Sequence, residues 1–272
     1  MLHYPILGRR SRASCLQPAG CDAARKVARY AVRMAKDGSL ESELRENFAH
    51  ARAERDAANG VPRMAADRMA VRAFQQARLA ATHADLLASS EFGPAAHFFL
   101  TELYSTEDLT QRDADIERVI KILVRFLPDK ALTTLAAALE MDALSERLDG
   151  QMVTALRSVQ NNGEPLKIDG NRYQRAYRRV GQQELRLRQM ALTQSIGAAL
   201  NHLARKPLLR GLLRMMRTPA VAGGVGGLHE FLERGYAAFA HMKDGQAFIR
   251  SIAQRELVEH DRLMANTCAG GT

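Results

Sequence analysis

The sequence contains no tryptophan, and aromatic residues make up only 6% of its 272 positions. Proline is also scarce, with eight residues in the whole chain. Long stretches are instead rich in Ala, Leu, Arg, Glu and Gln, which have high helix propensity. The composition therefore predicts an all-α protein.

Cysteine is equally scarce, and Cys15, Cys21 and Cys268 all lie near the ends of the chain. Their number is odd and no C-x-x-C motif occurs, so no disulfide framework is predicted. Such usage fits a reducing compartment, and we expect a cytoplasmic protein. No apolar run approaches the roughly 18 residues that a membrane-spanning helix needs. We therefore expect no membrane partner.

The net charge of +9 is distributed unevenly along the chain. Residues 1–36 hold eight basic residues and one acid, whereas residues 91–149 hold twelve acids and six bases. Residues 172–217 are basic again, with eleven Lys or Arg and one acid. This layout is compatible with internal charge complementarity as well as with an external anionic partner.

Hydrophobic periodicity predicts a single multi-helix globular domain of about eight helices over residues 61–266. A helical extension at 22–60 and a disordered basic arm at 1–21 are expected to precede it. The main predicted helices cover about 39–59, 62–88, 94–104, 110–127, 130–160, 171–204, 207–217 and 219–242, followed by a last helix after Gly245.

Signatures of catalytic and metal sites are missing. No Glu-x-x-His pair, H-E-x-x-H motif or Cys/His cluster with ligand spacing occurs, so no metal site is predicted. Walker and dinucleotide-binding glycine motifs are absent too. The pairs His229/Glu233 and Glu256/His260 have i, i+4 spacing, which is typical of exposed helix partners. No catalytic residue and no cofactor are therefore predicted.

Two stretches leave a ligand pocket open as an alternative. His97 lies in the apolar run that ends at Tyr104, which predicts either a core histidine with satisfied ring nitrogens or a polar anchor in a hydrophobic pocket. The second stretch has glycines near a helix start, where glycine costs about 0.8–1 kcal/mol relative to alanine. Either close helix packing or an approaching ligand would explain them. These glycines are Gly223, Gly224, Gly226 and Gly227.

The segment 172–189 predicts an amphipathic basic helix. Its arginines fall broadly on one side, and apolar residues such as Tyr173 and Tyr177 fall on another. A helix of this kind can bind phosphates or an acidic partner, although many such faces are only solvated surface. The candidate anion- or partner-binding residues are Arg172, Arg175, Arg179 and Arg186.

The chain resembles a family of uncharacterised, all-helical proteobacterial proteins over roughly residues 61–264. The segments that carry the resemblance are Phe98-Phe99-Leu100, Leu103-Tyr104, Arg112-Asp113 with Ile116, Leu144-Ser145 with Leu148-Asp149, the row from Pro219 through Gly227, Phe231, Gly235 and Phe239 to Met242, and Arg255-Glu256. Ser105 stands where the family pattern has a glycine. The resemblance implies one helical unit and brings no established activity.

Three functions remain open from the sequence. We favour a non-catalytic binding or regulatory module, possibly self-associating, that uses the 172–217 surface or the 223–242 helix. One alternative is a helical pocket protein or enzyme for an apolar or haem-like ligand. The other is weak nucleic-acid binding, mainly through the basic arm.

Overall fold

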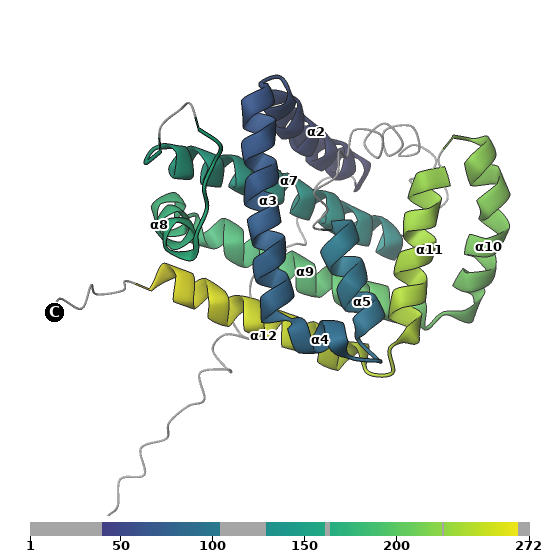
Figure 1. The fold of residues 1–272 in the computed structure, drawn as a ribbon. Helices are drawn as coiled ribbons and strands as arrows, with labels where there is room; N and C mark the ends of the chain where they lie inside the picture. The colour runs from purple at the N-terminus through teal and green to yellow at the C-terminus, as the bar shows by residue number, and fades with distance from the viewer. Residues whose placement is uncertain (1–39, 104–128, 161–163, 225, 266–272) are drawn as a thin grey trace, which may run out of the picture.

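The computed structural model describes residues 40–103, 129–160, 164–224 and 226–265 (Figure 1). All regular elements within these ranges are helices, which confirms the all-α prediction. They are α2 (Leu40–Asn59), α3 (Pro62–Thr82), α4 (Ala84–Ala88), α5 (Gly93–Phe98), the π-helix η1 (Phe99–Leu103), α7 (Asp129–Arg157), α8 (Gly170–Val180), α9 (Gln183–Ala204), α10 (Pro207–Ala222), α11 (Gly226–His241) and α12 (Gly245–Met264).

The described residues contain more helices than the expected eight because predicted helices are interrupted. The helix predicted at 171–204 divides at Gly181 and Gln182, whose φ angles are 63° and 51° and cannot continue a right-handed helix. The helix predicted at 62–88 divides at His83. Pro219 was expected to begin a helix but lies inside α10, where the helix ends at Ala222, less than one turn later.

The helices form one bundle (Figure 1). α7 lies at its centre and packs against α2, α3, α8 and α9, while α12 runs along α8 and α9. α10 and α11 form a hairpin at the end of the bundle opposite α8. The elements expected at 1–39 and 104–128, including the basic arm, the acid-rich helix start and Tyr104, lie outside the described residues.

Several apolar clusters hold the bundle together, and two of them concern the predicted elements most directly. One is a ring cluster in which Phe99 lies 5.7 Å from Phe239 and 6.0 Å from Phe248 between ring centroids. Another joins α2 to α7 through Leu44 and Leu132, among other side chains. α2 therefore packs on the same bundle as the helices that follow it.

Gly235 allows α11 to approach α5 closely. A Cβ atom at this buried position would lie 2.9 Å from Cζ of Phe98, whose ring is itself packed against Phe231. We predict that Gly235→Ala lowers the free energy of unfolding by about 1–3 kcal/mol, because the buried ring has little room to move. The matched control is Gly227→Ala in the same helix, where a Cβ would meet nothing within 4 Å.

Guanidinium denaturation of both variants tests this packing. The control should be neutral or up to about 1 kcal/mol more stable, since alanine favours helix over glycine. Equal stability changes in the two variants would contradict the close approach.

Candidate functional site

The interior of the bundle contains a carboxylate surrounded by arginines. Glu146 of α7 is only 1% exposed. Its oxygens accept hydrogen bonds from Arg55 of α2 at 3.2 Å, from Arg68 of α3 at 2.6 Å, and from Arg72 of α3. Removing such charges from water costs several kcal/mol per ion, which only close pairing offsets. Glu146 therefore ties α2 and α3 to α7.

Asp149 extends this network by one helical turn along α7. Its oxygens accept from Nε of Arg72 at 3.2 Å and from the amide of Gln75 at 3.1 Å. Burial raises the pKa of Asp149, although the charge of Arg72 opposes the shift. The bonded partners of Glu146 and Asp149 lie on α2 and α3, so this arrangement serves to connect helices.

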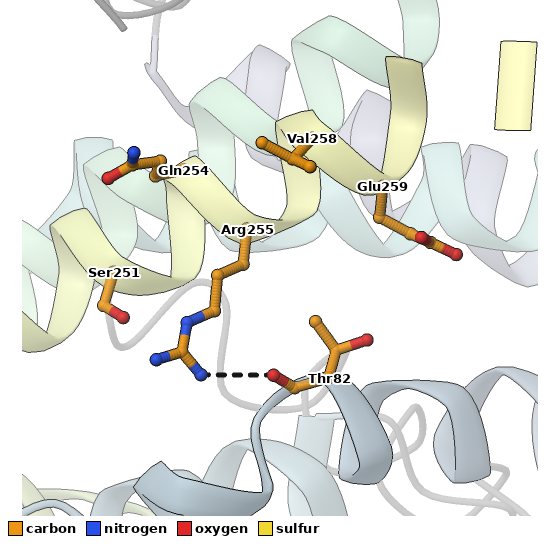
Figure 2. Close-up of a pocket in the computed structure, with 6 residues that line it drawn as sticks. All are labelled: Thr82, Ser251, Gln254, Arg255, Val258 and Glu259. Atoms are coloured by element: carbon orange, nitrogen blue, oxygen red, sulfur yellow. Dashed lines mark hydrogen bonds between the residues drawn. The ribbon is translucent and has the colours of Figure 1, made fainter. Parts of the chain in front are cut away.

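A second set of ion pairs connects α12 to the end of α3. Glu256 accepts from Arg78 at 2.9 Å and lies 2.9 Å from Nε2 of His83. Arg255, one residue earlier, donates to the carbonyl of Thr82 at 3.1 Å, and it spans a surface groove of about 460 Å³ (Figure 2). The predicted exposed pair of Glu256 with His260 is wrong, because the two side chains bond different helices.

His260 is buried, and its Nδ1 lies 2.8 Å from the hydroxyl of Tyr177. Burial raises the pKa of Tyr177 to about 12, so the hydroxyl stays protonated and can donate to the ring. Burial lowers the pKa of His260; the carboxylate of Asp261 opposes this shift, and the charge of Arg186 adds to it. The imidazole is therefore held neutral within the core.

Arg186 differs from the expectation that it faces outward with the other arginines. It is 5% exposed, and its guanidinium carbon lies 3.6 Å from the ring centre of Tyr177. Its Nε donates to the carbonyl of Gly181 at 3.2 Å. The break at Gly181 rotates α9 relative to α8, which turns this arginine inward, where a cation–π contact stabilises it.

The remaining predicted arginines lie on α8. Arg175 and Arg179 are exposed, while Arg172 is half-buried and pairs with the N-cap residue Asp169 at 3.3 Å. Arg179 donates to the hydroxyl of Ser158 at 2.8 Å. Arg175 has no ion-pair or hydrogen-bond partner within the described residues. The basic face predicted from sequence is thus smaller than expected, and centres on Arg175 and Arg179.

The residues considered for a ligand pocket lie at the surface where they are described. His97 is exposed on α5, so the expectation that it is a buried histidine is wrong. A polar anchor in an apolar pocket must be shielded from water, which removes the physical reason for assigning that role to His97. Tyr104 lies outside the described residues.

The four glycines lie where α10 ends and α11 begins. Gly223 follows the last residue of α10, and Gly224 has a φ of 73°, a backbone conformation that favours glycine after a helix end. Gly226 and Gly227 begin α11, where Gly226 is half-buried and Gly227 exposed. Turn geometry accounts for Gly224, so the glycine stretch does not itself require a bound ligand.

The most exposed apolar side chains among the described residues lie on α10. Leu208 is 87% exposed and Met215 is 68% exposed, and both share one flank of the helix with Leu212 at i, i+4, i+7 spacing. Arg210, Arg214 and Arg217 follow the same spacing two residues later, which places them on the opposite flank. The side of α10 between these two flanks packs against α11, where a ring nitrogen of His229 lies 2.8 Å from the carbonyl oxygen of Leu213.

Comparison with protein families gives a match over residues 54–269 to a domain of unknown function, DUF8198. The chain belongs to this family. The match confirms the resemblance to an uncharacterised helical family described above. Searches among curated proteins and among solved structures gave no match.

The family match includes the whole of α3 to α12 and begins in the second half of α2. It carries no assigned activity, so functional inference depends on the surfaces of this chain. In the part of the chain that the structure describes, none of the helices combines the length and apolar content of a membrane span.

Sequence reasoning missed the buried ion network. A signal was present, because Arg68 and Arg72 are spaced i, i+4 and Glu146 and Asp149 are spaced i, i+3, so each pair lies on one helix face. Periodicity marks such faces but does not say which two faces meet. The partners in the Glu146 network are 74 to 91 residues apart in the chain.

The neutral, buried His260 predicts a pH-dependent stability. An unfolded histidine titrates near pH 6.5, and the folded pKa lies lower, so this contribution is complete above about pH 6.5 and is lost as the pH falls through the folded pKa. We predict that the free energy of unfolding decreases between about pH 7.5 and pH 5, and that His260→Phe reduces this decrease.

Denaturation curves across this pH range provide the measurement. His97→Phe is the matched control, because it replaces a histidine that is exposed on α5 and outside the core. An identical pH dependence in the wild-type protein and His260→Phe would contradict the assignment.

Proposed function

We propose that the protein is a non-catalytic helical binding module whose contact surface is α10. The observation that carries the proposal is the exposed stripe of Leu208, Leu212 and Met215, with Leu208 87% exposed. Exposed apolar side chains scattered singly are ordinary, but a contiguous stripe at helical spacing is typical of a docking surface.

The charge of α10 indicates the chemistry of the partner. Residues 205–222 contain five basic residues and no acid. Arg210, Arg214 and Arg217 have no ion-pair or hydrogen-bond partner among the described residues. A second copy of the chain would bring two such basic helices together, which like-charge repulsion disfavours. The partner we propose is an amphipathic helix of another protein with an acidic flank.

The outward side of α10 leaves room for such a helix. Gly211 and Thr218 lie on this side, between the apolar and the basic flank, and a Cβ at Gly211 would meet nothing within 4 Å. Small residues allow two helix backbones to approach closely. A docked helix could then contact the leucine stripe on one side and the arginines on the other.

Site-specific photocrosslinking in producing cells tests this surface. We predict that p-benzoylphenylalanine at Met215 forms an adduct of one defined mass. The same group at Val258, which is 64% exposed on α12, should not form that adduct. The yield of this adduct at position 215 should fall at high salt and in the double variant Arg210→Glu with Arg214→Glu. Salt screens the arginine charges and the substitutions reverse them, and both changes weaken the binding of an acidic partner.

Three outcomes would contradict the proposal. Identical adducts at both positions would show nonspecific contact. An adduct of twice the chain mass would identify a second copy as the occupant. A crosslinking yield at position 215 that does not change with salt or with charge reversal would exclude an acidic partner. Folding is checked with Leu208→Ser, whose free energy of unfolding should stay within about 0.5 kcal/mol of wild type, since the side chain is exposed.

A further inference from the structure

A groove of about 510 Å³ lies at the end of the bundle away from α10. The ends of α2, α7 and α8 and the start of α3 form it, and α8 and α10 are at opposite ends of the molecule (Figure 1). Its volume falls in the range of roughly 300–1,000 Å³ that is typical of small-molecule sites. We infer that this groove binds a small soluble organic anion, independently of the surface on α10.

The charges that line the groove are not balanced. Three arginines and one carboxylate face it, and that carboxylate, Glu54, pairs with Arg68 at 3.3 Å. Arg147 has no ion-pair or hydrogen-bond partner within the described residues, and Arg179 bonds the neutral hydroxyl of Ser158. Two guanidinium groups from α7 and α8 therefore border the groove without a neutralising acid.

The base of the groove is held rigid by the interior network. The side chain of Arg68 is 8% exposed and donates to Glu146 at 2.6 Å. A Cβ at Gly150 would lie 2.7 Å from Nη2 of Arg68, so glycine at this position leaves space for the guanidinium. The buried Nε of Arg68 and Oε1 of Gln151 have no hydrogen-bond partner. The polar groups beneath the groove are thus fixed in place and incompletely satisfied.

Apart from Thr154, the other lining residues are apolar, which limits the class of ligand. Ala57, Met64 and Val180 contribute to the walls, and Met64 is 36% exposed. A free inorganic anion would leave these walls in contact with water. A phosphate monoester or carboxylate on an apolar body would cover them while its head group binds Arg147 and Arg179. Guanidinium groups suit such head groups because their N–H donors match the oxygens of the anion.

Calorimetric titration with phenyl phosphate tests the site on the full chain. We predict saturable binding with one site per chain, weakened about tenfold or more in Arg147→Ala with Arg179→Ala, since two charge-assisted contacts are lost. The matched control is Arg250→Ala, which removes an exposed arginine of α12 that does not line the groove and should leave binding unchanged. Helical content measured by circular dichroism confirms that the variants fold.

Each remaining outcome would overturn the inference. Binding that is absent at millimolar phenyl phosphate, or unchanged in the double variant, would exclude the groove. Inorganic phosphate that binds as tightly as phenyl phosphate would exclude a role for the apolar walls. A lipid is the other source of a phosphate head group. The protein could sediment with vesicles of phosphatidylcholine and phosphatidic acid in a way that depends on Arg147 and Arg179, and yet fail to bind phenyl phosphate. That result would show that the ligand is a lipid and not a soluble anion.

Discussion

The buried carboxylate of Glu146 is the constraint on which the rest of the structure depends. One side chain that is nearly inaccessible to water accepts hydrogen bonds from arginines of two other helices. A charge in this position requires its partners, because an unpaired buried ion destabilises a fold by several kcal/mol. The relative positions of α2, α3 and α7 are therefore set by polar geometry as well as by apolar packing.

Two groups of arginines differ in this respect among the described residues. Arg55, Arg68 and Arg72 are neutralised inside the bundle and have a structural role. Arg147 and Arg179 at the groove, and the three arginines of α10, have no carboxylate partner among the described residues. Positive charge without a carboxylate partner is therefore present on two surfaces at opposite ends of the bundle. The net charge of the whole sequence does not reveal this division.

Sequence periodicity was sufficient for the fold class and for much of the core. Phe231, Gly235 and Phe239 have the spacing of one helix face. All three are buried or half-buried on α11, and Met242 directly after the helix is buried too, although Leu232 is 46% exposed. Backbone conformation was harder to predict, because Gln182 adopts a left-handed φ that its residue type does not signal. That local break is also the reason why Arg186 was placed on the wrong side of its helix.

The candidate surfaces were only partly predictable. Arg175 and Arg179 were identified from their spacing, but the groove beside Arg179 depends on α2, α3 and α7, which lie far away in sequence. The exposed stripe of α10 is ambiguous in sequence, since Leu208 and Met215 have the spacing of core residues. Only the three-dimensional arrangement shows that the side of α10 with Leu213 faces α11 and that the stripe stays exposed.

Hydrogen exchange of the guanidinium protons, measured by nitrogen-15 NMR with arginines assigned by substitution, tests this division of the arginines most directly. The account predicts slow exchange for the guanidinium protons of Arg55, Arg68 and Arg72 that donate to Glu146. It predicts exchange at the rate of free arginine for Arg147, Arg210 and Arg214. Equally fast exchange in both groups would contradict the buried network on which the account depends.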